Sequence, residues 1–265
     1  QSFAKRRRAA KFRSMKKALI TGATSGIGEG LAKALANKGF DLYLTGRNEE
    51  KLQSLKNELN AKVEIFPCAL EEDYRPLLHW MEEFAPGLII NNAGFGLYGD
   101  MINHSVEEQT AIVRVNCEAL LAITLKGAQL MRAKGKHGTI LNISSAGGYQ
   151  PFPGFAAYVA SKAFVTSLST SLHEEMSDYG INVLVSCPGR IRTNFAKRAS
   201  KQPEEKKAPG YVMTLEYAVD RMIRQMETGK PVDIFDWHYR FLVHLSRWIP
   251  DQWICKLLRK KANLN

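Results

Sequence analysis

Short apolar runs alternate with segments of helical periodicity along most of the chain. Between the apolar runs, leucines and other apolar residues recur every three or four positions, which is typical of amphipathic helices. We expect seven strands, at 17–21, 40–46, 62–68, 87–94, 138–144, 182–189 and 231–236. We expect helices near 27–38, 48–60, 106–133, 156–179 and 214–228.

Regular strand–helix alternation predicts βαβ units and a parallel sheet covered by helices on both faces. The chain has 265 residues, which is enough for one well-buried core. We therefore expect one α/β domain over 16–236, a Rossmann-like three-layer α/β/α sandwich with a parallel sheet of about seven strands. A basic tail (1–15) precedes this domain, and an amphipathic basic extension (237–265) follows it.

The formal net charge of +11 belongs mainly to the N-terminal tail. Residues 1–17 carry eight lysines and arginines and no acid, which leaves +3 for the remainder. The basicity therefore does not indicate a nucleic-acid-binding fold, and we expect no nucleic-acid partner. The tail has three interpretations. It could be a disordered stretch that is not native, if the native chain starts at Met15. It could also be a flexible arm that binds anionic lipid or nucleic acid, or a transit peptide.

Four cysteines lie far apart and show no metal-ligand spacing, and the six histidines show none either. We expect reduced thiols in a cytoplasmic protein and no metal site. No run of 18 apolar residues occurs, so we expect no segment that spans a membrane.

The segment "TGATSGIG" at 21–28 joins the first predicted strand to the first predicted helix. The N–H groups at a helix N-terminus favour a phosphate. We expect Gly22 to permit a tight turn, Gly26 to let the backbone approach a diphosphate, and Gly28 to let the helix pack closely on the sheet. The loop predicts a dinucleotide-binding site, and we expect Thr24, Ser25 and Ile27 to contact the dinucleotide as well. The alternative is that the loop is a simple βα turn.

Tyr158 and Lys162 are four residues apart and share one face of a predicted helix. A tyrosine hydroxyl can donate or accept a proton in catalysis, but its ordinary pKa, about 10, is high for that task near neutral pH. A neighbouring ammonium stabilises the phenolate, although lowering the pKa by about three units requires roughly 4 kcal/mol. Lys162 would therefore have to be buried, with help from an oxidised nicotinamide; an ordinary surface pair is the alternative.

Four motifs together resemble the short-chain dehydrogenase/reductase family: "TGATSGIG", "NNAG" at 91–94, "YVASK" at 158–162 and "CPG" at 187–189. The resemblance extends from Lys16 to Asp236, and a looser one points to the 3-oxoacyl-reductase subgroup. It implies an oxidoreductase that uses NAD(P) and transfers hydride between a carbonyl and an alcohol.

The resemblance also implies a catalytic tetrad of Asn116, Ser145, Tyr158 and Lys162. Ser145 would bond the substrate oxygen, with its neighbour Ser144 as the alternative. Asn116 would hold a water linked to Lys162. Its alternative is an amide satisfied by neighbouring backbone inside an apolar helix.

Further cofactor contacts are expected where the parallel strands end. The resemblance places Asn92, Ala93 and Gly94 at the adenosine ribose. It places Pro188, Gly189, Ile191 and Thr193 beside the nicotinamide. The family commonly has an aspartate that contacts the adenine, but this chain has Ala69 at that position. We expect the following residue, Leu70, to contact the cofactor, and Glu71 is the acid that could replace the aspartate.

The end of the second strand predicts which dinucleotide binds. NAD-binding relatives have a carboxylate there for the ribose 2′-hydroxyl, but this chain has Gly46 followed by Arg47. A guanidinium binds a 2′-phosphate well, so we expect NADPH rather than NAD. The alternative is that Arg47 is only a solvated surface charge.

Two segments near the C-terminus are expected to frame the substrate. The loop 194–213, whose polar part is 197–210, would be mobile and close over the substrate with Phe195, Tyr211 and Met213 as apolar lining. The extension 237–265 combines tryptophans with lysines and arginines. It would pack on its own domain, on a partner subunit, or at a membrane interface, the last of which would favour a hydrophobic substrate.

These observations predict an NADPH-dependent enzyme that reduces a ketone or aldehyde, such as a 3-oxoacyl group or another hydrophobic ketone, or runs the reverse reaction. An NAD-dependent alcohol dehydrogenase of the same fold is one alternative. A nucleotide-binding regulatory protein at a membrane surface is the other. The resemblance implies a homodimer or homotetramer.

Overall fold

A computed structural model describes residues 12, 15–135, 137–200, 211–246 and 248–262. The expected tail at 1–15 lies outside these residues except for Phe12 and Met15, and so does 201–210 of the expected mobile loop. Phe12 and Met15 are buried, and Phe12 packs against Phe40.

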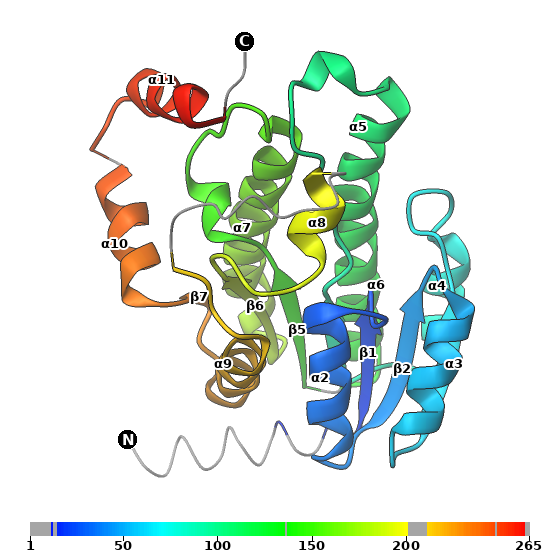
Figure 1. Cartoon of the computed structure of the whole chain (residues 1–265). Coiled ribbons are helices and arrows are strands. Elements are labelled where there is room, and N and C mark those ends of the chain that lie inside the picture. The colour runs from blue at the N-terminus through cyan, green and yellow to red at the C-terminus, as the bar shows by residue number, and fades with distance from the viewer. Residues whose placement is uncertain (1–11, 13–14, 136, 201–210, 247, 263–265) are drawn as a thin grey trace.

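A seven-stranded parallel sheet forms the centre of the molecule, in the order β3-β2-β1-β4-β5-β6-β7 (Figure 1). This order confirms the predicted fold class. The strands are β1 (Lys17–Thr21), β2 (Asp41–Gly46), β3 (Val63–Pro67), β4 (Leu88–Asn91), β5 (Gly138–Ile143), β6 (Ile181–Cys187) and β7 (Val232–Ile234). All seven predicted runs contain a strand, and most end slightly early because the chain turns into loops that line the candidate site.

Ten α-helices connect and flank the strands of the described chain. They are α2 (Gly26–Ala36), α3 (Glu49–Glu58), α4 (Arg75–Phe84), α5 (Val106–Val113), α6 (Leu120–Ala133), α7 (Ala156–Ser177), α8 (Phe195–Ser200), α9 (Leu215–Thr228), α10 (Trp237–Ser246) and α11 (Asp251–Ala262). Short 3₁₀ turns occur at η1 (Met101–Asn103) and η3 (Ala146–Tyr149). The helix expected over 106–133 is present, but a π-helical segment, η2 (Arg114–Ala119), interrupts it.

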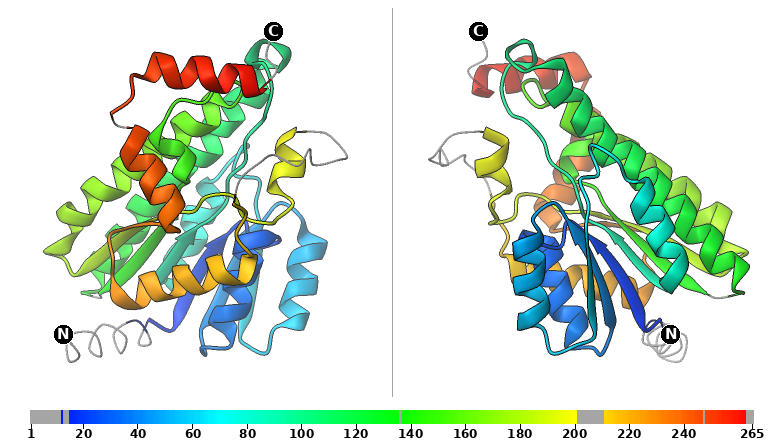
Figure 2. Two further views of the ribbon diagram at one scale, coloured as in Figure 1. Left: turned by 60° about the vertical axis from the view of Figure 1, so that its left-hand side comes forward. Right: turned by 90° about the vertical axis from the view of Figure 1, so that its right-hand side faces the viewer.

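The helices form two layers, one on each face of the sheet (Figure 2). Helices α2, α3 and α9 pack on one face, and α4, α6 and α7 pack on the other. Neighbouring strand residues point to opposite faces, so Ile20 belongs to the first core cluster and Leu19 to the second. Both clusters are almost fully buried, which explains why the strands read as continuous apolar runs.

Helices α4 and α8 lie where the sequence predicted no helix. Helix α4 buries Leu77, Met81 and Phe84, which are spaced as on one helix face, and has a proline in its first turn. That spacing is a helical signal that sequence reasoning overlooked. Helix α8 occupies part of the loop expected to be mobile.

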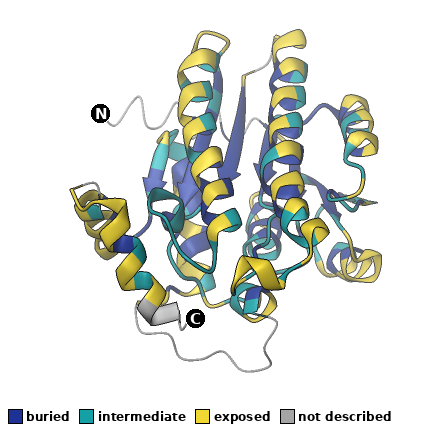
Figure 3. Ribbon diagram, turned by 90° about the horizontal axis from the view of Figure 1, so that it is seen from above, coloured by how far each residue is buried: buried dark blue, intermediate teal, exposed yellow. Residues whose placement is uncertain are grey.

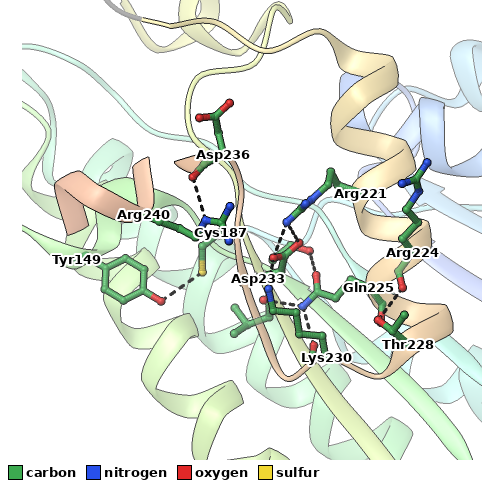
Figure 4. A network of polar contacts seen from close by, with 12 residues as sticks. Tyr149, Cys187, Arg221, Arg224, Gln225, Thr228, Lys230, Asp233, Asp236 and Arg240 are labelled. Carbon is green, nitrogen blue, oxygen red and sulfur yellow. Dashed lines mark hydrogen bonds and ion pairs between the residues drawn. The ribbon is translucent and has the colours of Figure 1, made fainter. Parts of the chain in front are cut away.

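A buried polar network joins α9 to β6 and β7 at one edge of the sheet (Figure 4). Asp233 is 3% exposed, and both of its oxygens lie 2.7 Å from Nη2 of Arg221. Nε2 of Gln225 donates to the carbonyl oxygens of Val185 and Lys230, at 3.0 Å each. The network holds the end of β6, from which the chain enters the Pro188–Gly189 loop.

We expect Asp233→Ala to lower the free energy of unfolding by about 3 kcal/mol, because it leaves a partly buried guanidinium without its carboxylate. Chemical denaturation of both proteins measures this difference. Asp220→Ala is the matched control, since Asp220 pairs with Arg224 where both side chains are more than half exposed, and its expected effect is below about 1 kcal/mol. Equal losses in the two variants would contradict the structural role of Asp233.

Candidate active site

Tyr158 and Lys162 lie near the N-terminal end of α7, beside the carboxyl ends of β4 and β5. Lys162 is 4% exposed, and its Nζ donates to the carbonyl oxygen of Ile143 at 2.8 Å. That nitrogen lies 5.7 Å from the centre of the Tyr158 ring. The two residues are therefore not a solvated surface pair, and Lys162 has the burial that the pKa argument requires.

Burial dominates the pKa values of both groups. It lowers the pKa of Lys162 to about 8 and raises the pKa of Tyr158 to about 12, which a hydrogen bond with Ser145 opposes only in part. The protein alone thus does not lower the pKa of Tyr158, contrary to the expectation for a neighbouring ammonium. Desolvation of the phenolate is the largest cause of the shift, and the tyrosine stays protonated near neutral pH.

The two serines after β5 have different surroundings. Ser144 is 2% exposed, and its hydroxyl bonds the carbonyl oxygen of Lys162 and Oγ1 of Thr166, at 2.7 Å each. The Ser145 hydroxyl accepts from the backbone N–H of Gly147 at 3.1 Å and is hydrogen-bonded with Tyr158. Ser144 therefore anchors α7, whereas Ser145 faces the tyrosine.

Asn116 sits in the π-helical segment η2 and is fully buried. Its Nδ2 donates to the carbonyl oxygen of Phe95 and to Oγ of Ser161, at 2.9 Å each, and its Oδ1 accepts from the N–H of Phe95 at 3.1 Å. A Cβ added at Gly94 would lie 3.0 Å from Oδ1 of Asn116 and 3.3 Å from Nζ of Lys162. These two polar atoms therefore both lie close to Gly94, and π-helical turns are frequent at functional sites.

The glycine loop needs its glycines for close packing as well as for its turn. Gly22 and Gly26 have φ angles of 63° and 55°, in the left-handed region. A Cβ on Gly28 would lie 2.3 Å from the oxygen of Gly22. Asn92 reaches across from the end of β4 and donates from Nδ2 to the oxygens of Thr21 and Gly22, at 2.9 and 3.0 Å.

The N-terminus of α2 provides a cradle that fits a dinucleotide diphosphate. Ser25 precedes the helix but makes no capping hydrogen bond with its side chain. Its Oγ instead accepts from Nη2 of Arg198 in α8, at 3.2 Å. The Thr193 methyl would lie 3.3 Å from a Cβ on Gly26, so the two chain segments approach each other over the helix N-terminus.

At the other end of this cradle, Nη1 of Arg47 bonds Oε1 of Glu71 at 2.7 Å. Arg47 is largely exposed, and Thr24 lies beside Gly46. Leu70 is 6% exposed and belongs to the second core cluster. Its side chain therefore packs inward, as does that of Ile27 against the first cluster.

The loop after β6 is held from both sides. The oxygen of Pro188 accepts from the N–H of Ala146 at 2.8 Å, next to Ser145. Tyr239 of α10 lies flat against Gly189, where a Cβ would meet its ring at 2.1 Å. The Tyr239 hydroxyl accepts from the N–H of Arg190 at 3.1 Å and donates to the oxygen of Tyr211 at 2.8 Å.

Aromatic rings pack next to Tyr158. The rings of Phe155 and Phe195 lie 4.3 and 5.4 Å from that of Tyr158, and Tyr98 lies 5.8 Å from Phe155. The N–H of Tyr98 also donates to the oxygen of Ala199 in α8, at 2.8 Å. Helix α8 thus crosses from the glycine loop to the loop after β4.

Only one of the three residues expected to line the substrate lies against Tyr158, and that is Phe195. Met213 is 1% exposed and packs in the first core cluster, because its backbone pairs with Ile191 and turns the side chain inward. Tyr211 is exposed and stacks on His238, with ring centres 5.5 Å apart.

Comparison with known proteins agrees with this geometry. The family model for short chain dehydrogenases matches residues 16–204. The chain belongs to this family. The match covers both the glycine loop and the Tyr158–Lys162 pair.

Curated short-chain dehydrogenase relatives include enzymes that act on long acyl chains. A very-long-chain 3-oxoacyl-CoA reductase-like protein of Arabidopsis thaliana is 35% identical over an alignment of 196 residues, and the match covers 69% of this chain and 62% of that protein. The very-long-chain 3-oxoacyl-CoA reductase of Pyricularia oryzae is 36% identical over an alignment of 193 residues, and the match covers 66% of this chain and 58% of that protein. The chain therefore spans about three fifths of the length of these two relatives.

Solved structures of the family superpose along most of the chain. A short-chain dehydrogenase of Sphingobium yanoikuyae in complex with NADPH superposes with a TM-score of 0.73 and 30% sequence identity. The match covers 88% of this chain and 94% of the Sphingobium chain. The bulky-bulky ketone specific alcohol dehydrogenase of Comamonas testosteroni has a TM-score of 0.74 and 26% identity, with coverage of 88% and 92%.

Sequence reasoning missed several residues that shape this short-chain dehydrogenase site. They are Phe95, Tyr98, Phe155, Ser161, Arg198 and Tyr239. Ser161 lies within the YVASK motif and Phe155 lies three residues before it, so a search around that motif could have found both. Arg198 and Tyr239 carry no local signal, because only the folded chain brings them to the site.

The buried ammonium of Lys162 opposes folding, so we expect Lys162→Met to raise the thermal midpoint while it disables the site. Below pH 8 the full cost of burying the charge is present, about 3 kcal/mol for a pKa shift from 10.5 to about 8. Loss of the hydrogen bond to Ile143 offsets about 1 kcal/mol of the gain.

The expected stabilisation is thus about 2 kcal/mol at pH 7. It shrinks as pH rises from 8 to 10.5, because the lysine is then neutral in the folded state and increasingly neutral in the unfolded state. Thermal unfolding of both proteins between pH 6 and 10 measures this trend. A variant that is less stable than the wild type at pH 7 would show that the hydrogen bond outweighs the desolvation.

Proposed function

We propose that this chain is an NADPH-dependent oxidoreductase that reduces a hydrophobic ketone to an alcohol, or runs the reverse reaction. The observation that carries the proposal is the convergence of three groups: the Tyr158 hydroxyl, the Ser145 hydroxyl and the buried Lys162 ammonium. They meet at the carboxyl edge of a parallel sheet, next to a helix N-terminus that fits a diphosphate.

The proton step follows from the pKa values. Reduced nicotinamide supplies a hydride to the carbonyl carbon when it is bound. Tyr158, with a pKa of about 12, is protonated at neutral pH and can give its proton to the carbonyl oxygen. The Ser145 hydroxyl is placed to bond the same oxygen, and Lys162 next to Tyr158 stabilises the phenolate left behind.

Asn116 would support this step by holding the neighbouring segments in place. Its bonds to Phe95 and Ser161 tie η2 to α7 and to the loop after β4. We propose that a water near the Asn116 side chain and Nζ of Lys162, both of which lie close to Gly94, returns a proton to the pair. In this proposal the four residues act as the tetrad implied by the family resemblance.

Aromatic rings beside Tyr158 favour a substrate with an apolar body. Phe155, Phe195 and Tyr98 offer flat apolar surface at the place where the carbonyl must lie. The names of the Pyricularia oryzae and Comamonas testosteroni relatives, which specify very-long-chain 3-oxoacyl-CoA and bulky ketones, are consistent with this class. We place 3-oxoacyl thioesters first among the substrates to test.

NADPH is favoured over NADH by the residues at the end of β2. Gly46 offers no carboxylate to the ribose, and Arg47 offers a guanidinium to a 2′-phosphate. Glu71 binds that guanidinium, so a 2′-phosphate would have to share or displace this ion pair. The Sphingobium yanoikuyae structure contains NADPH, which supports the choice. A homodimer or homotetramer and a cytoplasmic location stay predictions.

Tyr158→Phe should reduce turnover by at least about 1,000-fold, because it removes the proton donor but leaves the ring in place. The assay follows NADPH and NADH oxidation in parallel with short- and long-chain 3-oxoacyl thioesters, steroid ketones and simple aldehydes. Tyr179→Phe is the matched control. Tyr179 is exposed just beyond the C-terminal end of α7, whereas Tyr158 lies near the N-terminal end of that helix, and the Tyr179 ring lies under the Arg132 guanidinium.

Wild-type turnover on one substrate class, lost only in Tyr158→Phe, would support the enzyme and identify the class. Full activity in Tyr158→Phe would overturn the proton-transfer role. Tight NADPH binding with no turnover on any substrate class would favour the regulatory alternative.

Arg47→Ala should raise the KM for NADPH by about 10- to 100-fold and leave the KM for NADH nearly unchanged, because it removes one charge-assisted bond to the 2′-phosphate. Glu71→Gln should lower the KM for NADPH, since it releases the guanidinium. Steady-state kinetics with both dinucleotides measures the effects. If Arg47→Ala weakened both dinucleotides equally, Arg47 would not read the 2′-phosphate.

A further inference from the structure

The two last helices leave most of their large apolar side chains outside the core. Six large apolar side chains are more than half exposed, five on these helices and Trp248 between them. They define what we call the C-terminal surface: Trp237, Phe241, Leu242, Trp248, Trp253 and Leu257. Trp248 is 87% exposed and Trp253 is 69% exposed. The ribbon that leads to the C-terminus is accordingly coloured mainly as exposed in Figure 3.

Packing on the same domain uses only a few residues of these helices. Tyr239 anchors α10 on the Pro188–Gly189 loop, and Val243 and Ile254 are buried. The expectation that the extension packs on its own domain is therefore only partly correct. Exposed apolar residues of this size gathered on two consecutive helices indicate a binding surface.

Charge on the same segment favours one kind of partner. The chain has four tryptophans, and three of them lie between 237 and 253. The segment 237–265 also contains six lysines and arginines but one acid, Asp251. Arg240, Lys256 and Arg259 are exposed on the described helices. Tryptophan beside lysine and arginine on short amphipathic helices is typical of helices that lie in the interface of an anionic bilayer.

A second copy of the chain fits the segment less well. Lysine is depleted at protein–protein interfaces, whereas it is favoured next to anionic headgroups. No helix among the described residues is long and apolar enough to cross a membrane. These two short helices could therefore only lie parallel to the membrane surface, within its interface.

The C-terminal surface also lies towards the end of the molecule at which the strands end and the candidate active site is found. Helices α10 and α11 lie at the same end as α8 and the loop before α5 (Figures 1 and 2). That loop and the start of α5 expose further apolar residues, among them Ile102 and Val106, which are 86% and 72% exposed. A bilayer against this edge would meet both groups of side chains.

We propose that the C-terminal surface docks the protein onto an anionic lipid bilayer, with the tryptophans at the level of the headgroups and Lys256 and Arg259 paired with lipid phosphates. The inference goes beyond the reaction, because binding to lipid requires no turnover. It also gives a reason for the placement of apolar helices next to a site suited to hydrophobic ketones: such substrates partition into the bilayer.

The test is flotation of the full chain with vesicles of phosphatidylcholine alone or mixed with phosphatidylglycerol. We expect binding to the mixed vesicles, a blue shift of tryptophan emission, and quenching by brominated lipid. The variants Trp248→Ser/Trp253→Ser and Lys256→Glu/Arg259→Glu should each weaken binding at least about 10-fold, since each basic residue contributes about 1 kcal/mol near an anionic surface.

Two controls separate this surface from the rest of the chain. Leu125→Ser replaces an exposed apolar side chain on α6, and Lys51→Glu reverses an exposed charge on α3. Both should leave vesicle binding unchanged. The basic tail at 1–17 stays intact in every variant, so binding through that tail would survive both C-terminal double substitutions.

Binding that is equal on neutral vesicles, or unchanged in both double variants, would overturn the proposal. Absence of vesicle binding together with a dimer that Trp248→Ser/Trp253→Ser dissociates would also overturn it, and would identify a second copy as the partner. The far-ultraviolet circular dichroism of each variant shows whether the fold is retained, and this check does not depend on the proposed reaction.

Discussion

The ammonium of Lys162 is the constraint around which the candidate site is arranged. It is buried beneath Tyr158 and held by the carbonyl oxygen of Ile143 at the end of β5. Burying a charge opposes folding, so the surroundings must be held in place by other contacts. Ser144 and Thr166 bond the α7 backbone at Lys162, and Asn116 bonds Ser161 one residue earlier. These contacts fix α7 against β5 and η2, and thereby fix Tyr158.

The dinucleotide end of the molecule depends on close backbone packing rather than on charge. Gly28 lies so near Gly22 that no side chain fits between them, and Asn92 ties that turn to the end of β4. The two functional ends therefore share the loop after β4, since its Asn92 serves the glycine turn while Gly94 and Phe95 contact Asn116. A cofactor bound at one end would be positioned relative to Tyr158 by this single loop.

The C-terminal helices continue the same arrangement outward. Tyr239 holds the loop beside the candidate nicotinamide site, so α10 is joined to the carboxyl edge of the sheet. Beyond this anchor, apolar and basic side chains face away from the core. A surface of this composition next to an aromatic-lined site connects the proposed lipid contact with the proposed class of substrate.

The sequence by itself determined the fold class, the seven strands and the Gly22, Tyr158 and Lys162 positions, because buried parallel strands and glycine turns leave strong local patterns. It could not decide between Ser144 and Ser145 from the residues alone, since both follow β5 and only their partners differ. It also could not assign Arg198 or Tyr239 to the site, since each comes from a segment distant along the chain. The tertiary structure alone decided that burial raises the pKa of Tyr158 and that the C-terminal tryptophans stay exposed, because desolvation depends on which atoms surround a group in space.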